Sequence, residues 1–320
     1  MNLTILIPAY NEENTIGDVI DLIPKDFPKI KKTTIIVVDD GSTDKTSQIA
    51  KSKNAFIIKH SSNQGVGKSF QDGLAKAIAL QSDILVTIDA DGQFNPKEIP
   101  KLIQPIINKS ADFVIGSRFI GESQTPKNMS RIKIWGNKRM ASLISWFTKY
   151  RFKDVACGFR AYGQEAMLQL NLFGKFTYTQ ETLLDLAYKG LNIIEVPVNV
   201  KYFKNRKSRI ANNVLSYALK TLNIIFLTIK NYKPLKFFGI SGIIIFTAGL
   251  ICDIFVFSHF LKTGSFTPYK IIGFLGAFLN ANGIVIFFIG VLADLIDKVR
   301  VTQEKILYFE KKKYYRNEEN

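Results

Sequence analysis

Two aspartates stand one residue apart in Asp89-Ala90-Asp91-Gly92-Gln93, directly after the apolar run Ile84–Ile88. The run is rich in β-branched residues, which predicts a buried strand that ends at the first acid. Two carboxylates this close repel each other unless a cation lies between them. In open α/β sheets, ligands bind at the carboxyl ends of the strands. The spacing therefore indicates a divalent-metal site, and a solvated Asp-Gly turn is the alternative.

The elements that must position these acids alternate along the N-terminal part of the chain. This alternation, with short polar turns, predicts an α/β fold with a mostly parallel sheet and helices on both faces. Strands are expected at Leu3–Ile7, Thr34–Asp39, Ala55–Lys59, Ile84–Asp89 and Phe113–Gly116, and helices near Thr15–Ile23, Lys45–Lys51, Gly67–Leu80 and Pro96–Ile107.

Two further turns at predicted strand ends carry charged side chains. The acidic turn Asp39–Asp44 can accept hydrogen bonds from a nucleotide base or ribose, although its Ser42, Thr43 or Asp44 could equally cap the next helix. Arg118, after Gly116-Ser117, suits bidentate phosphate binding, with a solvated surface charge as the alternative.

The segment Asn63–Ser69 is close to an ATP-binding phosphate loop, because it ends in Gly67-Lys68-Ser69. The first glycine of that motif is missing, since Ser62 occupies its position. A glycine turn that opens a helix is therefore the preferred interpretation.

The composition narrows the function further. The 320 residues carry a net charge of +16, which favours an anionic partner such as a phospholipid surface or a phosphorylated substrate. Nucleic acid is a weaker choice, because the excess charge flanks apolar segments. The chain has only two cysteines and two histidines, so a disulfide framework, a histidine-based metal site and a catalytic triad are disfavoured.

Two apolar runs, Phe237–Leu261 and Ile271–Ile296, are each long enough to cross a bilayer core of roughly 30 Å. Asp253, Asn280 and Asn282 lie within them and are expected to form hydrogen bonds between the helices. Basic residues are denser outside the two runs than between them, which predicts that the N-terminal domain and both termini are cytoplasmic. A pair of buried helices in a soluble domain is the alternative.

The segment 131–150 contains both tryptophans, Trp135 and Trp146, and four basic residues lie within its first ten positions. Basic helices with exposed tryptophan lie in the headgroup plane of membranes. We expect an interfacial segment here, with an ordinary surface helix as the alternative.

Taken together, the motifs resemble those of family 2 glycosyltransferases with the GT-A fold. Within that family the chain is similar to the polyprenyl-phosphate glycosyltransferases, the group of dolichyl-phosphate mannose synthase and bactoprenol glucosyltransferase. The motifs that carry the resemblance are Ile7–Glu13, Val38–Asp44, Asn63-Gln64-Gly65, Asp89–Pro96, Gly116-Ser117-Arg118, Asp154–Arg160 and Glu195-Val196-Pro197.

The resemblance implies roles for individual residues. Asp89, Asp91 and Gln93 would hold Mg²⁺ or Mn²⁺, Arg118 and Arg131 would bind the lipid phosphate, and Asp154 and Glu181 would approach the sugar and acceptor. The nucleotide sugar would contact Pro8, Ala9, Tyr10, Glu12, Val37, Asp39, Ala90, Gln180, Lys204 and Arg209.

The chain departs from the family in the loop Arg206-Lys207-Ser208-Arg209, where a glycine and a lysine are usual. It also lacks the Gln-x-x-Arg-Trp motif of polymerising members, which argues against a chitin- or cellulose-type synthase.

The implied reaction is an inverting transfer of a hexose from GDP-mannose or UDP-glucose to a polyprenyl (dolichyl or undecaprenyl) monophosphate. A membrane-anchored transferase with a saccharide or protein acceptor, and a non-catalytic membrane scaffold, are the alternatives. The expected organisation is a GT-A domain at 1–210, an interfacial helix at 211–235, a transmembrane hairpin at 236–297 and a charged cytoplasmic tail at 298–320. The end of this tail, Glu310–Asn320, is expected to be solvated or disordered. The sequence is also compatible with a homo-oligomer.

Overall fold

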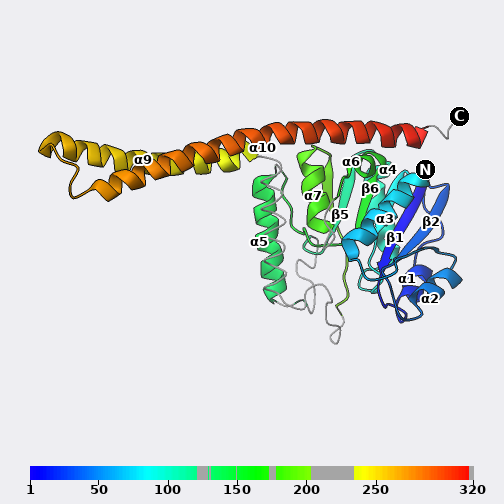
Figure 1. Cartoon of the computed structure of the whole chain (residues 1–320). Helices are drawn as coiled ribbons and strands as arrows, with labels where there is room; N and C mark the ends of the chain where they lie inside the picture. The colour runs from blue at the N-terminus through cyan, green and yellow to red at the C-terminus, as the bar shows by residue number, and fades with distance from the viewer. Residues whose placement is uncertain (121–128, 130, 149, 173–177, 203–233, 317–320) are drawn as a thin grey trace. The chain divides into compact units, whose positions relative to one another are not determined.

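The computed structural model describes the chain except residues 121–128, 130, 149, 173–177, 203–233 and 317–320 (Figure 1). It divides into two compact units. The first comprises residues 1–225 together with 307–320, and the second comprises residues 226–306.

The first unit is built on a seven-stranded sheet of order β3-β2-β1-β4-β6-β5-β7. Every neighbouring pair is parallel except the two that involve β6, which runs antiparallel between β4 and β5. This confirms the predicted α/β class with a mostly parallel sheet. The strands are β1 (Asn2–Ala9), β2 (Lys32–Asp39), β3 (Phe56–Lys59), β4 (Ile84–Thr87), β5 (Phe113–Ser117), β6 (Arg160–Gly163) and β7 (Ile193–Pro197).

The helices of this unit that alternate with the first five strands lie close to their predicted positions, and β6, β7 and the helices after α5 were not anticipated. The helices and one 3₁₀ turn are α1 (Ile16–Asp21), α2 (Thr46–Ser52), α3 (Val66–Ala79), η1 (Pro96–Glu98), α4 (Ile99–Ile107), α5 (Arg131–Phe147), α6 (Gln164–Gln169) and α7 (Thr179–Tyr188).

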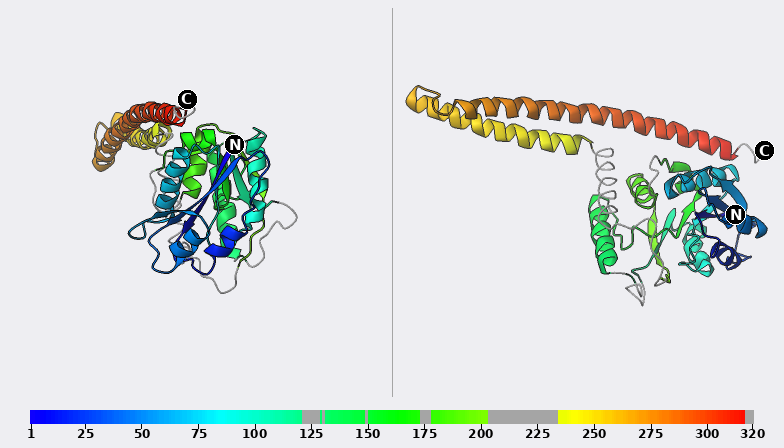
Figure 2. Two further views of the ribbon diagram at one scale, coloured as in Figure 1. Left: turned by 90° about the vertical axis from the view of Figure 1, so that its right-hand side faces the viewer. Right: turned by 60° about the horizontal axis from the view of Figure 1, so that its bottom comes forward.

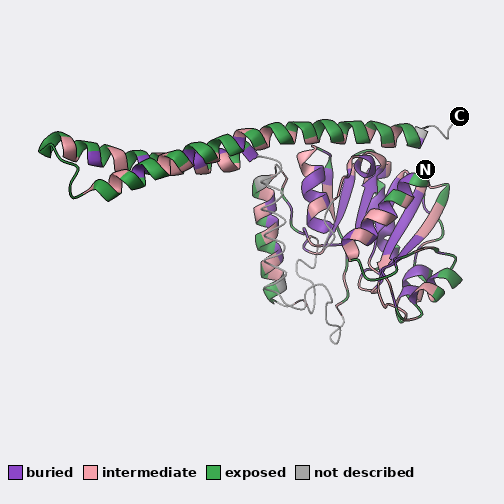
Figure 3. Ribbon diagram, in the orientation of Figure 1, coloured by how far each residue is buried: buried purple, intermediate pink, exposed green. Residues whose placement is uncertain are grey.

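Helices cover both faces of the sheet, as two neighbouring residues of β6 show. Tyr162 contacts Phe70 of α3, with ring centroids 5.4 Å apart. A Cβ atom on Gly163 would point instead at Ile106 of α4, 3.2 Å away. Because successive residues of a strand face opposite sides, α3 and α4 lie on opposite faces. The central strands β1, β4, β6 and β5 are almost entirely buried, as Figure 3 shows in purple.

The second unit contains α9 (Pro234–Thr263) and most of α10 (Lys270–Arg316). Both helices are long and apolar enough to cross a membrane, and their side chains are mostly exposed (Figure 3). Their backbones approach closely at glycines: a Cβ on Gly242 would lie 2.8 Å from the carbonyl oxygen of Gly283. Asn280 donates a hydrogen bond of 2.5 Å to Asp253, which confirms the expected bond between the helices. Asn282 bonds instead within its own helix, to Phe278.

The C-terminal end of α10 belongs to the first unit. Its helix continues through the charged segment expected to be solvated, and Figure 2 shows it in red as continuous helix. Tyr308 donates to Glu165 at 3.1 Å, Lys311 donates to the carbonyl of Leu170 at 2.8 Å, and Tyr315 donates to the carbonyl of Gln81 at 3.0 Å. The segment is therefore helical up to Arg316, and these three side chains dock on α6 and on the end of α3, whereas most other side chains of residues 298–314 are exposed.

Candidate active site

The candidate site lies along one edge of the sheet, which we call the rim. The carboxyl ends of β1, β2, β4 and β5 meet there. Strand β1 is parallel to β2 and β4, and β5 runs in the same direction as β4 because both are antiparallel to β6. The antiparallel strand β6 starts at this edge, since Arg160 pairs with Thr87 at the end of β4. The rim therefore gathers residues that follow β1, β2, β4 and β5 and residues that precede β6.

Asp89 lies at the rim two residues after β4 and is partly buried. Burial raises the pKa of its carboxyl from 3.8 to about 7, and the charges of Asp91 and Glu12 add to the rise. The positive charges of Arg118 and Arg160 act in the opposite direction and lower this pKa. The structure thus brings Glu12, Asp89 and Asp91 together as a group of acids whose repulsion a bound cation would relieve.

The wall behind Asp89 is the backbone of Gly158. A Cβ atom there would lie 3.1 Å from both carboxylate oxygens of Asp89. The Gly158 carbonyl accepts hydrogen bonds from Thr87 at 2.7 Å and from Tyr178 at 3.2 Å. These contacts fix the wall, and the absence of a side chain at Gly158 leaves room for the acid.

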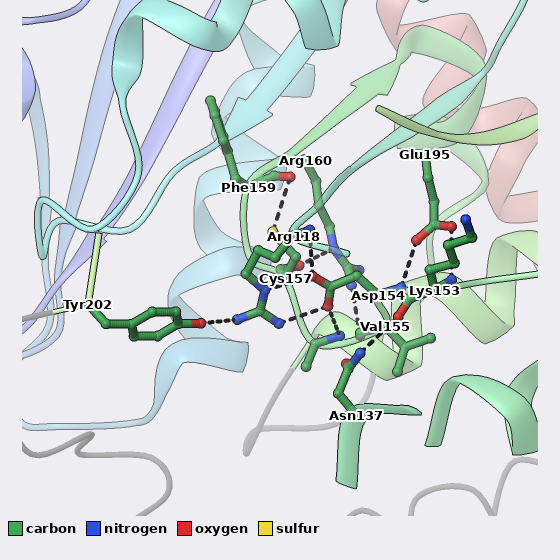
Figure 4. Close-up of polar contacts among 11 residues, drawn as sticks. Arg118, Asn137, Lys153, Asp154, Val155, Cys157, Phe159, Arg160, Glu195 and Tyr202 are labelled. Carbon is green, nitrogen blue, oxygen red and sulfur yellow. Dashed lines mark hydrogen bonds and ion pairs between the residues drawn. The ribbon is translucent and has the colours of Figure 1, made fainter. Parts of the chain in front are cut away.

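Arg118 and Asp154 form a buried ion pair in two-pronged geometry (Figure 4). The Arg118 Nε and Nη2 atoms lie 2.6 and 2.8 Å from the two Asp154 oxygens, and the Arg118 backbone N–H donates to Asp154 at 3.0 Å. The Nη1 atom donates to the Tyr202 hydroxyl at 2.9 Å. In this structure the guanidinium of Arg118 and the carboxylate of Asp154 are paired with each other. The separate roles that the resemblance implies for them, on the lipid phosphate and on the sugar, stay predictions.

Two residues that support this pair had no predicted role, although both lie in motifs that the sequence displays. Glu195 of β7 accepts the backbone N–H groups of Lys153 and Asp154 at 2.9 and 2.7 Å. Arg160 is fully buried and donates to three carbonyls and to Thr182. Burial also raises the pKa of Cys157 to about 12, so this thiol stays protonated and is no nucleophile.

The residues expected around the nucleotide fall into two groups. Tyr10, Glu12 and Pro8 are partly exposed at the end of β1, where a ligand can reach them. Val37, Asp39, Ala9, Ala90 and Gln180 are buried. Asp39 accepts hydrogen bonds from the Ser42 backbone at 2.8 Å and from the Ser47 hydroxyl, so its carboxylate shapes the turn after β2.

The remaining predicted residues belong to different segments of the chain. Gln93 and Glu181 are partly exposed, and the Gln93 backbone N–H donates to Asp91 at 3.0 Å. Arg131 is exposed at the first residue of α5. Lys204 and Arg209, with the loop that departs from the family pattern, lie outside the described residues.

The donor atoms at the rim fit a hard divalent cation. Mg²⁺ and Mn²⁺ prefer carboxylate oxygens and commonly take one or two of them, with substrate phosphates and water completing the coordination. Asp89 and Asp91 provide such a pair, and burial, followed by the charge of Asp91, raises the pKa of Asp89. Although Glu12 lies near enough to influence Asp89 electrostatically, the described residues contain no group of three or more Asp, Glu, His or Cys side chains placed to hold one metal ion. A metal here would therefore depend on oxygens from its substrate.

Comparisons with known proteins agree with this architecture. A family model described as "Glycosyl transferase family 2" matches residues 4–170. The UDP-N-acetylglucosamine–dolichyl-phosphate N-acetylglucosaminyltransferase of Methanococcus voltae is 36% identical, over 67% of this chain and 92% of its own. Glycosyltransferase AglJ of Haloferax volcanii is 27% identical over 94% of this chain and 95% of its own.

Solved structures show the same fold. Glucosyl-3-phosphoglycerate synthase from Mycobacterium tuberculosis, in complex with Mn²⁺, UDP-glucose and phosphoglyceric acid, superposes with a TM-score of 0.57. The match covers 71% of this chain and 79% of that one at 20% identity. The N-terminal unit therefore has a GT-A-like fold.

Proposed function

The chain belongs to glycosyl transferase family 2, and from this premise we propose that it transfers one sugar residue from a nucleotide sugar to the phosphate of a polyprenyl monophosphate. The relative from Methanococcus voltae is named for this kind of reaction, which supports the proposal. That the protein is a glycosyltransferase follows from its family. Its donor and its lipid acceptor are what we propose.

The observation that carries the proposal is the group of acids at the rim. Asp89 and Asp91 would hold a divalent cation on the diphosphate of the donor, where the cation would offset the charge of the departing nucleoside diphosphate. Glu12 and Tyr10 lie at the neighbouring strand end, on the side where the nucleotide would rest. We call the rim from Pro8 to Glu12, the turn 39–41 and these two aspartates the donor pocket.

The attacking group would be an oxygen of the lipid phosphate, which displaces the nucleoside diphosphate from the anomeric carbon with inversion. A phosphate monoester has a second pKa near roughly 6, so at neutral pH it is already largely dianionic. No strong general base is then required. This agrees with the state of Asp154, which is buried in its ion pair with Arg118 rather than poised to accept a proton.

A lipid acceptor would explain why the chain carries two long apolar helices, α9 and α10. The phosphate of a polyprenyl chain is presented only at a bilayer surface, so the enzyme must work there. We propose that α9 and α10 span the bilayer, with the catalytic domain on the cytoplasmic side. Glycine contacts and the Asp253–Asn280 bond hold such a hairpin together.

Helix α5 offers a surface suited to lipid headgroups. Trp135 and Trp146 are 62% and 76% exposed, and Ile132, Arg131 and Lys138 are exposed beside them. The opposite side of α5 is tied to the domain, where Asn137 donates to the Lys153 carbonyl at 2.8 Å. Apolar and basic side chains on one exposed face match the interface of an anionic bilayer. We therefore propose that α5 lies in the headgroup region.

Trp135 and Trp146 are the only tryptophans of the chain, so intrinsic fluorescence reports on α5 alone. In vesicles containing phosphatidylglycerol, we expect blue-shifted emission, quenching by brominated lipid and protection from acrylamide. Single Trp→Phe variants at 135 and 146 assign the signal to each residue. Emission that stays red-shifted and open to acrylamide in such vesicles would show that α5 is an ordinary surface helix.

The reaction is tested with the full chain in vesicles that contain polyprenyl monophosphate and Mn²⁺. Radiolabelled UDP-glucose, UDP-N-acetylglucosamine and GDP-mannose are supplied in turn. We expect one donor to give a labelled product that partitions into organic solvent. Label that stays in water-soluble saccharide or protein would support the anchored transferase with another acceptor. Failure to bind or hydrolyse any nucleotide sugar would support the scaffold.

A further inference from the structure

His60 follows β3 and is 7% exposed, between two acids. Its Nδ1 atom lies 2.7 Å from Asp40, and its Nε2 atom lies 2.9 Å from Asp72 of α3. The ring thus links the turn after β2 to helix α3 through both of its nitrogen atoms.

Other charged groups surround this ring. Lys68 of α3 lies 2.5 Å from the second oxygen of Asp72. Asp39, next to Asp40, turns its carboxylate toward Ser42 and Ser47 instead. Asp40, Asp72 and Lys68 are thus the charged groups that face His60, directly or through one contact. Asp40 is buried, and its hydrogen bonds offset the cost of taking its carboxylate out of water.

The acid that His60 holds also holds a loop. The Asp40 carboxylate accepts the backbone N–H groups of Gln64 and Gly65, both at 2.8 Å. The loop lies directly against Gly41, where a Cβ atom would come within 2.6 Å of the Ser62 backbone. Gly41 has a φ of 80°, which favours glycine, so the turn after β2 and the loop 61–65 form one tightly fitted edge of the donor pocket.

We propose that His60 is a positioning residue of the donor pocket, which bridges Asp40 and Asp72 and thereby fixes the loop 61–65 for the nucleotide sugar. His60 touches no substrate in this account. Without the ring, Asp40 loses its link to α3, and the loop that Asp40 binds is held less firmly. The proposal rests on the proposed function for its kinetic consequence, and on the contacts alone for its structural one.

The structural consequence is measured by amide exchange of the full chain in detergent without any nucleotide. In His60→Gln, we expect the Gln64 and Gly65 amides to exchange at least about tenfold faster, while amides of β1 are unchanged. His259→Gln is the matched control, because His259 lies in the other unit. Unchanged exchange at Gln64 and Gly65 in folded His60→Gln would overturn the proposal, whatever the protein transfers.

The kinetic consequence is a split between KM and kcat. With saturating Mn²⁺, we expect His60→Gln to raise the donor KM roughly tenfold and to leave kcat within about twofold.

Asp72→Ala keeps the test decisive if His60→Gln does not fold, because Asp72 is partly exposed. It leaves the contact with Asp40 but removes the link to α3, so the Gln64 and Gly65 amides should again exchange faster and the donor KM should rise. Unchanged exchange at these amides in Asp72→Ala, or a loss confined to kcat in His60→Gln, would contradict the proposal. Absence of transfer by the wild type would overturn the proposed function while leaving the exchange test intact.

Discussion

Replacing Asp89 by asparagine is expected to reduce sugar transfer roughly a thousandfold or more, and at the same time to stabilise the metal-free protein at neutral and alkaline pH. The loss of transfer follows from removing a carboxylate that would hold the cation. The gain in stability follows from the raised pKa of Asp89, which is 3.8 ordinarily and about 7 in the folded protein. The folded state therefore resists ionisation that the unfolded state accepts freely.

The sign and range of this effect follow from proton linkage. Between about pH 4 and pH 7 the folded protein binds a proton at Asp89 that the unfolded chain has released, so stability falls as pH rises. Above pH 7 the ionised Asp89 carboxylate lowers the free energy of unfolding by its full amount, at most roughly 4 kcal/mol. The uncharged amide of the asparagine variant would not carry this penalty.

Thermal unfolding in EDTA measures this directly. The Asp89→Asn variant should melt higher than the wild type at about pH 8 and equally at about pH 4. Mn²⁺ should raise the melting temperature of the wild type only. Asp26→Asn, which changes an exposed acid, is the control. Equal melting at the higher pH, or transfer that survives the change, would contradict the assignment of Asp89.

Replacing Arg118 by methionine is expected to destabilise the catalytic domain by about 3–5 kcal/mol, besides reducing transfer. Asp154 is fully buried, and Arg118 makes two of its hydrogen bonds through the guanidinium group. Methionine would leave this carboxylate without its counter-ion. An arginine that is open to phosphate would behave differently, because its loss would reduce transfer and leave stability unchanged.

A double-mutant cycle separates these two cases. Arg118→Met with Asp154→Leu removes both charges, so the pair should be more stable than Arg118→Met alone. Unfolding of all three variants by denaturant gives the coupling energy. Additive effects of the two substitutions would show that the ion pair does not hold the site together.

The sequence was sufficient to predict the strands that are apolar throughout. The runs 3–7 and 84–88 could hardly be anything but buried strands, and β1 and β4 lie there. Strand β6 was missed because it begins with Arg160, a charged residue that is fully buried. Strand β7 was missed because it contains Glu195 and ends in proline. A search for apolar runs passes over strands whose charges find partners only in the folded protein.

The same limit applies to the site. The acids Asp89 and Asp91 could be predicted because their spacing alone implies repulsion. The pairing of Arg118 with Asp154 joins residues from separate strands and loops, and so does the contact of His60 with Asp40. Nothing in either local sequence indicates its partner. The docking of Tyr308 and Tyr315 was hidden likewise, because charged neighbours made the end of α10 look solvated.

The most direct test of the account is the mass of the lipid product made by the full chain from polyprenyl monophosphate, nucleotide sugar and Mn²⁺. We expect the mass of the lipid to increase by one glycosyl residue while it keeps a single phosphate, with release of the nucleoside diphosphate. A product with a second phosphate and release of the nucleoside monophosphate would mean that sugar phosphate is transferred. That result, or an unchanged lipid alongside a glycosylated saccharide or protein, would contradict the proposal.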